Sequence, residues 1–199
     1  MGEYIRNMNS EQKEKLTRLR ERGHIKEREQ RLQNNVLFQE CLEALSCYEI
    51  IVDGKDYLSE VKDLIIEYSE RLGRDLSFQN IDEELQDPAH KYTAPEGEIL
   101  VAIENEKVVG MVAYHRHSVE RCEMKRLYVK PETRGMHLGD ALVEAIIDHA
   151  RTAGYKEMVL DTIEPLKAAI SLYKKHGFEE CEAYYHNPMD DVIYMRKAP

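Results

Sequence analysis

Hydrophobic positions follow two different spacings along residues 48–197, and these spacings predict a series of strands and helices. Short runs rich in β-branched and aromatic residues predict strands over residues 48–52, two strands around an Asn-containing turn within 98–117, and strands over 121–129, 155–162, 178–187 and 191–197. Apolar residues three and four positions apart predict helices over residues 55–73, 75–87, 139–154 and 164–177. Three of these helices end at a glycine, a common helix terminator: Gly73, Gly154 and Gly177.

The predicted order of elements is β-α-α-β-β-β-α-β-α-β-β. Strands joined by short turns pair antiparallel, whereas the strands on either side of the helix over residues 139–154 are suited to a parallel crossover. The order therefore predicts an α/β domain of the mixed α+β kind. Its sheet begins antiparallel and contains one parallel crossover in the middle.

Residues 1–46 differ in character from the predicted domain over residues 47–199. They are dense in charge and have helical spacing, which Gly23 interrupts. We expect a helical extension that packs on the domain or on a second subunit, and a separate partner-binding arm is the alternative. A homodimer that involves residues 1–46 is therefore one interpretation.

Charge and cysteine usage narrow the classes of partner and compartment. Residues 1–46 carry a net charge of +1 and residues 47–199 carry −11, which disfavours nucleic acid as a partner. Such a domain would attract small cationic amines, although ordinary solubility charge explains the excess equally well. The 4 cysteines form no CxxC pair, and no apolar run approaches the length of a membrane span. We expect a cytoplasmic protein with no membrane contact and no signal peptide.

The loop between the strand over residues 121–129 and the following helix has the composition of an anion-binding site. It contains Arg134, Gly135 and Gly139, and no acidic residue between Thr133 and Gly139. Helix N-termini present unpaired N–H groups, glycines let backbone approach an anion, and arginine offers a planar donor fork. The Walker-A and GxGxxG patterns are absent. From the loop alone, glycines that serve only packing are an equally good explanation.

Two motifs at a fixed distance make the loop more specific. V-x-P-x-x-R-G-x-x-x-G (Val129–Gly139) is followed by A-x-x-L-Y-x-x-x-G-F (Ala169–Phe178). Over about residues 48–197 the chain resembles the GNAT superfamily of acyl-CoA-dependent N-acyltransferases. The resemblance implies a central mixed, mostly antiparallel sheet of six to seven strands flanked by helices, with acetyl-CoA as acyl donor.

The resemblance also implies where coenzyme A would bind. The pyrophosphate would rest on the loop and the first helical turn: Arg134, Gly135, Met136, His137, Leu138, Gly139 and Asp140. The pantetheine arm would pair with the strand end Leu127, Tyr128 and Val129, between two splayed parallel strands. His137 stands where a middle glycine is usual in this family. A positive φ is costly for most side chains, and histidine is among the better-tolerated ones.

Two residues match catalytic positions of the family. Tyr173 matches the tyrosine that many members use as general acid for the coenzyme A thiolate, and a packed core tyrosine is the alternative. Glu123 matches a basic glutamate, and a half-buried carboxylate beside a thioester would have a raised pKa. An ion-paired glutamate on a solvated face explains Glu123 equally well. Leu166 replaces an asparagine common in the family.

The acceptor pocket is less defined by the sequence. The family resemblance brings in Phe78, Gln79, Tyr185 and Asn187, and Arg126 could attract a carboxylate. His115 and His117 lie two positions apart on one strand, but no third ligand has a suitable spacing, so no metal is expected.

The leading hypothesis is an N-acetyltransferase that moves an acetyl group from acetyl-CoA to a primary amine of a small molecule or peptide. Transfer would be direct, in one ternary complex. The alternative is a non-catalytic acyl-CoA-binding sensor or interaction module, motivated by His137 and Leu166. A nucleotide-binding regulator is a third, weaker hypothesis.

Overall fold

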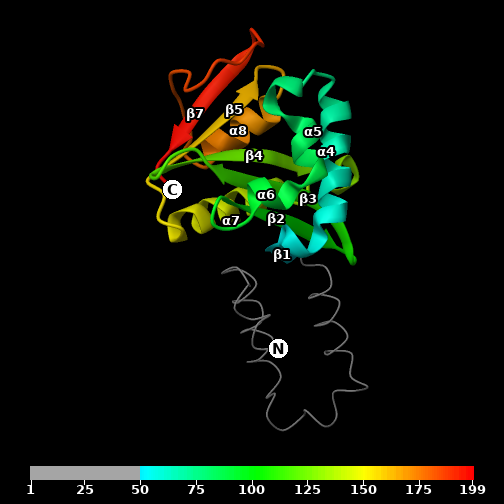
Figure 1. Cartoon of the computed structure of the whole chain (residues 1–199). Coiled ribbons are helices and arrows are strands. Elements are labelled where there is room, and N and C mark those ends of the chain that lie inside the picture. Colours follow the sequence, from blue (N-terminus) through cyan, green and yellow to red (C-terminus); the bar gives the residue numbers. More distant parts are fainter. Residues whose placement is uncertain (1–49) are drawn as a thin grey trace, which may run out of the picture. The chain divides into compact units, whose positions relative to one another are not determined.

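Seven strands form one mixed sheet in residues 50–199, the part of the chain that the computed structural model describes (Figure 1). The strands are β1 (Ile50–Asp53), β2 (Gly97–Glu104), β3 (Lys107–Arg116), β4 (Arg121–Val129), β5 (Glu157–Ile163), β6 (Glu179–Glu180) and β7 (Val192–Lys197). Their order across the sheet is β1-β2-β3-β4-β5-β7-β6. Only β4 and β5 pair in parallel, on either side of one helical crossover. The predicted α/β fold with a mostly antiparallel sheet is confirmed.

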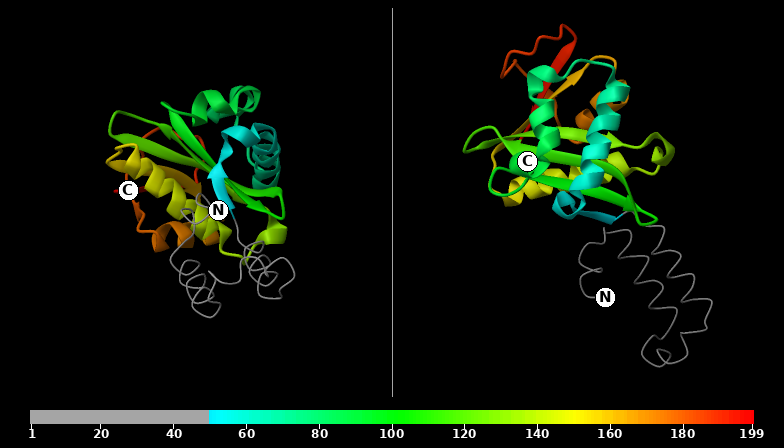
Figure 2. Two further views of the ribbon diagram at one scale, coloured as in Figure 1. Left: turned by 90° about the horizontal axis from the view of Figure 1, so that it is seen from below. Right: turned by 45° about the vertical axis from the view of Figure 1, so that its right-hand side comes forward.

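The helices lie in two layers, one on each face of this sheet (Figure 2). One layer contains α4 (Leu58–Leu72), α5 (Ile81–Gln86), α6 (Pro88–Tyr92) and the short 3-10 turns η3 (Gly54–Tyr57) and η4 (Ser77–Gln79). The other layer contains α7 (Leu138–Thr152) and α8 (Lys167–Lys175), and η5 (Pro131–Thr133) precedes α7. None of the helices within residues 50–199 is both long and apolar enough to cross a membrane.

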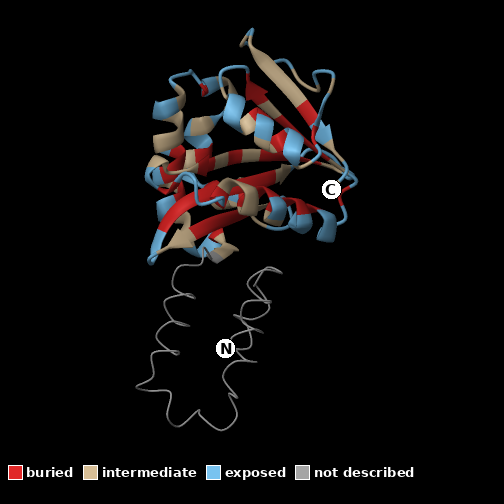
Figure 3. Cartoon of the chain, turned by 180° about the vertical axis from the view of Figure 1, so that it is seen from behind, coloured by how far each residue is buried: buried red, intermediate tan, exposed pale blue. Residues whose placement is uncertain are grey.

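The strands are buried on both faces because each helix layer covers one of them. In β2, Leu100 and Ala102 pack with the α7 and α8 layer, whereas Ile99 and Val101 pack with the α4 layer. The alternation follows the two-residue period of a strand. Figure 3 shows the buried residues concentrated along these central strands. This explains why β2 and β3 read as continuous apolar runs in the sequence.

Most predicted elements are present, and their ends have the predicted causes. Gly73 ends α4 with φ 62°, and Gly177 follows α8 with φ 83°. The turn between β2 and β3 places Asn105 and Glu106 at positive φ, as a tight hairpin requires. The two strands predicted within residues 98–117 therefore form the expected hairpin.

One predicted strand is wrong. Of residues 178–187, only Glu179–Glu180 form a strand, and the remainder is a loop on the α4 face of the sheet. The tyrosines that suggested a strand instead turn their hydroxyls to polar partners near β4 and β5. The short helix α6 was not predicted. The helical extension predicted over residues 1–46 lies outside the described residues.

Candidate active site

The parallel strands β4 and β5 separate towards their C-terminal ends. Backbone pairing between them covers Arg121 with Glu157, Cys122 with Met158 and Glu123 with Val159, and it stops there. Beyond Glu123 the backbone of β4 has no partner on the β5 side. A gap in the sheet therefore opens beside the strand end to which the family resemblance assigned the pantetheine arm.

A β-bulge distorts β4 within this gap. Met111 of β3 pairs with Tyr128 and Ala113 pairs with Lys125, so two β4 residues lie opposite Val112. Arg126, one of these two residues, has φ 58°. Bulges re-aim backbone and side chains, and they are frequent next to active sites.

A pocket lies at the gap, and its lining residues come from both faces of the sheet. On the α4 face it is lined by Tyr68, Leu72, Leu76, Gln79, Lys125, Arg126, Asp161, Ile163 and Met189. On the α8 face it is lined by Met124, Leu127, Thr162, Leu166, Ala169 and Tyr173. We call this pocket the cleft. Two molecules entering from opposite faces would meet in it.

The loop from Arg134 to Gly139 leads from β4 into the N-terminus of α7. Gly135 has φ 88° and His137 has φ 61°, so the position where the family usually has glycine does adopt a left-handed conformation. The His137 side chain is 84% exposed, and no side chain caps the α7 N-terminus. The first N–H groups of α7 lack helical partners and remain available to an anion.

The acidic residue nearest to this helix terminus is paired. The Asp140 carboxylate lies 2.5 Å from Lys175 Nζ and 3.0 Å from His176 Nε2, both at the end of α8. Lys175 and His176 lower the pKa of Asp140 although burial acts in the opposite direction. Because its charge is compensated, Asp140 opposes a nearby phosphate less than a free carboxylate would. Leu138 is buried, so only its backbone faces the loop.

Tyr173 places a phenol at the cleft. The side chain comes from α8, is 8% exposed and packs edge-on against Phe178 with ring centroids 5.9 Å apart. Burial, and secondarily the nearby Tyr68 and Asp161, raise the pKa of Tyr173 above its usual range. No residue in 50–199 hydrogen-bonds its hydroxyl, which stays protonated and free to donate.

Glu123 lies beside the cleft but is not among the residues that line it. Its carboxylate is held by Lys125 Nζ at 2.7 Å, by His115 Nε2 at 2.9 Å and by the Tyr184 hydroxyl at 2.8 Å. Burial raises the pKa of Glu123, but the contacts with His115 and Lys125 outweigh burial and hold it well below its usual range. The expectation of a raised pKa is therefore wrong. Sequence spacing does not reveal these three donors.

Asp161 extends this polar cluster into the cleft. Lys125 Nζ lies 2.5 Å from one Asp161 oxygen, and the other accepts hydrogen bonds from Tyr185 (2.9 Å) and Asn187 (3.3 Å). Lys125 also lies over the Tyr185 ring, 5.7 Å from its centroid. Tyr185 and Asn187 were predicted to bind the acceptor, and in the structure both donate hydrogen bonds to Asp161. Sequence analysis did not select Asp161 or Lys125 as site residues.

Arg126 is occupied in a similar way. Its guanidinium meets Glu84 of α5 through two bonds, Nε–Oε1 at 2.5 Å and Nη2–Oε2 at 2.9 Å, and it also bonds Gln79 at 3.1 Å. The pair is nearly buried, with side-chain exposures of 2% for Arg126 and 1% for Glu84. Arg126 therefore holds the β-bulge against α5, and its charge is already compensated by Glu84. Phe78 is half-buried in η4 and is not among the residues that line the cleft.

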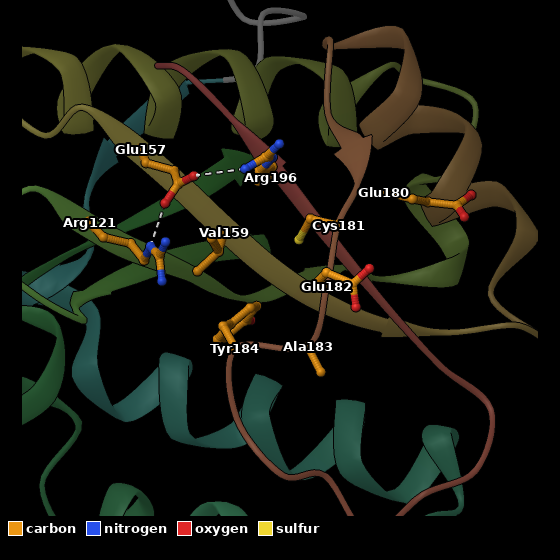
Figure 4. A pocket seen from close by; sticks show the side chains of 9 residues that line it. All are labelled: Arg121, Glu157, Val159, Glu180, Cys181, Glu182, Ala183, Tyr184 and Arg196. Atoms are coloured by element: carbon orange, nitrogen blue, oxygen red, sulfur yellow. Dashed lines mark hydrogen bonds and ion pairs between the residues drawn. The ribbon is translucent and has the colours of Figure 1, made fainter.

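A second pocket lies at the other end of β4 and β5 (Figure 4). Arg121 and Arg196 both approach Glu157 there, while Cys181 and Tyr184 contribute from the segment that follows α8. The Tyr184 hydroxyl reaches Glu123, so the polar cluster separates this pocket from the cleft. In residues 50–199 no three His, Cys, Asp or Glu side chains group closely enough to hold a metal ion.

Comparison with known proteins decides the family. The family model "Acetyltransferase (GNAT) family" matches residues 60–178. The chain is a member of the GNAT acetyltransferase family. The matched range contains the splayed strands, the loop before α7 and Tyr173.

Relatives within the family include proteins from several eukaryotes. An uncharacterised N-acetyltransferase of Schizosaccharomyces pombe is 49% identical over 70% of this chain and 86% of its own length. N-alpha-acetyltransferase 30 of the same organism is 30% identical over 66% of this chain and 95% of its own length. An acetyltransferase structure from Streptococcus agalactiae superimposes with a TM-score of 0.64 at 26% identity, covering 76% of this chain and 98% of that one. The GNAT fold and acetyl transfer are thus common to this chain and its relatives.

Proposed function

We propose that this GNAT acetyltransferase transfers an acetyl group from acetyl-CoA to a primary amine of a small molecule or peptide, directly and in one ternary complex. The observation that carries the proposal is the cleft through the sheet, which joins the free Tyr173 hydroxyl to a gap in backbone pairing. The family's use of acetyl-CoA supplies the donor.

In this proposal acetyl-CoA lies on the α7 and α8 face. Its pyrophosphate rests on the loop Arg134–Gly139 and on the uncapped start of α7, and its pantetheine arm pairs with the free edge of Leu127–Val129. These assignments use backbone groups, which suits a loop whose arginine is exposed and whose histidine points to solvent. A strand N–H near the bulge polarises the thioester carbonyl.

The acceptor reacts as the neutral amine, and its deprotonation is favoured because burial in the cleft disfavours an ammonium ion. The amine nitrogen bonds to the acetyl carbon, and the carbon–sulfur bond then breaks. Tyr173 gives its proton to the departing thiolate and recovers one from the acylated nitrogen, so no proton is gained or lost overall. Glu123, held anionic by its three donors, fixes Lys125 and Tyr184 and is not assigned as the base.

The Tyr173→Phe variant tests this proposal, because it removes only the phenolic oxygen and keeps the packing against Phe178. We expect kcat to fall by about 10²-fold or more, the usual size of a general-acid contribution, with little change in acetyl-CoA affinity. Free-thiol release and calorimetry measure the two quantities. Tyr114→Phe is the matched control, since Tyr114 is equally buried but lies outside the cleft. An unchanged kcat in Tyr173→Phe would remove Tyr173 from the acid role.

A further inference from the structure

The carboxylates around the cleft are already paired with basic side chains of the protein itself. Lys125 pairs with both Asp161 and Glu123, with its Nζ at 2.5 and 2.7 Å from them. Glu84 is neutralised by Arg126 and also by Lys91 at 3.1 Å. These acids have side-chain exposures of 8%, 7% and 1%, so none of them presents a free carboxylate to an incoming cation.

The hydrogen-bonding capacity of these carboxylates is also taken. The second Asp161 oxygen receives Tyr185 and Asn187, and the second Glu123 oxygen receives His115. Arg74, which follows α4, and Asp191, which precedes β7, also pair with each other at 2.7 Å. A second ammonium group of a substrate would therefore have to displace an internal cation, at the cost of its own desolvation.

On the α4 face, apolar side chains share the wall of the cleft with polar ones that are already paired, since Gln79 bonds Arg126 and Lys125 pairs with Asp161. Tyr68, Leu72 and Leu76 line the cleft from α4 and the segment after it, and Met189 lines it from the loop before β7. Methionine is adaptable and suits a binding wall that fits irregular shapes.

From these contacts we infer that the acceptor is a primary amine with an apolar substituent next to the amino group and no second cation. This inference rests on the proposed function and narrows its substrate class. It excludes polyamines and aminoglycosides as good acceptors, although the acidic composition would favour them. An aralkylamine and the N-terminus of a peptide with a large apolar first residue share the required chemistry.

An amine panel with the full-length protein tests the inference by free-thiol release from acetyl-CoA. We expect kcat/KM to be at least about 10-fold higher for leucinamide than for glycinamide, because the side chain is buried against the apolar side chains of the cleft. Cadaverine, which carries a second ammonium group, should be at least about 10-fold poorer than leucinamide. Phenethylamine and a peptide that begins with leucine distinguish an aralkylamine acceptor from a peptide N-terminus. A preference for cadaverine would overturn the inference while leaving acetyl transfer intact.

A matched pair of variants at Met189 tests the charge argument. Met189 is half-buried in a loop, so both Met189→Glu and Met189→Gln should fold. The glutamate adds a carboxylate without an internal partner and should raise the cadaverine-to-leucinamide ratio of kcat/KM by about 10-fold over the glutamine variant. Equal ratios in the two variants would overturn the inference. If acetyl-CoA binds but no amine releases thiol, the proposed function itself fails.

Discussion

At the scale of single residues, His137 adopts a backbone conformation that usually favours glycine. Its φ of 61° places it in the left-handed region, immediately before the first residue of α7. The side chain is exposed, and its nearest ionic neighbour is Asp140 at 3.7 Å, beyond hydrogen-bonding distance. His137 therefore affects the loop through its backbone conformation, and its side chain makes little contact with the rest of the protein.

The effect of substituting His137 on stability should depend on this left-handed backbone conformation. His137→Gly relieves the left-handed strain and should change the free energy of unfolding by no more than about 1 kcal/mol, whereas His137→Val should lower it by about 1–2 kcal/mol. Urea unfolding measures both. Acetyl-CoA affinity of the glycine variant should stay within about threefold of wild type, since backbone N–H groups make the proposed contacts. A large loss of affinity would assign the imidazole itself to the cofactor.

At the scale of elements, the Glu84–Arg126 pair joins helix α5 to the bulge of strand β4. The two residues are 42 positions apart in sequence, and both side chains are nearly inaccessible to solvent. Their geometry explains why an arginine occupies a left-handed position: its side chain ties the bulge to the wall of the cleft. Breaking the pair leaves an uncompensated buried charge.

Glu84→Ala should lower the free energy of unfolding by about 3–5 kcal/mol, the usual cost of removing one partner of a buried ion pair. Glu83→Ala on the same helix is the matched control. Glu83 is exposed, so its loss should change stability by no more than about 0.5 kcal/mol. Chemical denaturation compares the two variants, and equal effects would show that the pair contributes nothing.

The same pair predicts an acid-dependent loss of stability. Burial raises the pKa of Glu84, but Arg126 and Lys91 outweigh it and lower the pKa from 4.5 to about 2. Because the folded-state pKa is the lower one, this stabilisation is complete above pH 4.5 and decreases as the pH falls towards 2. The stability difference between wild type and Glu84→Gln should narrow over that range. A difference that is independent of pH would contradict the lowered pKa.

At the scale of the whole molecule, both helix layers contribute residues to the lining of one cleft. The uncapped helix start lies in the α7 and α8 layer, and Tyr68, Leu72 and Leu76 line the cleft on the α4 face. No cysteine lines the cleft within residues 50–199. Burial raises the pKa of Cys122 to about 12, and Cys181 borders the other pocket. A covalent acyl intermediate on Cys122 or Cys181 is therefore disfavoured.

Initial-rate kinetics should show a sequential pattern, with lines that intersect when both substrates are varied. The Cys122→Ala and Cys181→Ala variants should keep turnover within about threefold of wild type, because direct transfer needs no thiol nucleophile. Parallel lines, or loss of turnover in either variant while it remains folded, would instead support a ping-pong reaction.

The sequence by itself determined most of the order of elements, the hairpin of β2 and β3 and the loop before α7. These features depend on local periodicity and on residues such as Gly73 and Asn105, whose conformational preferences act over a few positions. The same local signals failed over residues 178–187, where tyrosines resembled a strand but bond across space to Glu123 and Asp161.

Only the tertiary structure decided how the charged residues of the site are paired. Lys125 meets Asp161 36 positions away and Arg126 meets Glu84 42 positions away, so no spacing in the chain reveals either contact. Such contacts depend on which faces of β4, β5 and α5 come together when the core packs. The acidic composition suggested a surface that binds cationic substrates, but these contacts pair the carboxylates around the cleft with cations of the protein itself. They also explain why Glu123 is not assigned as the base and why Arg126 is not assigned to substrate binding.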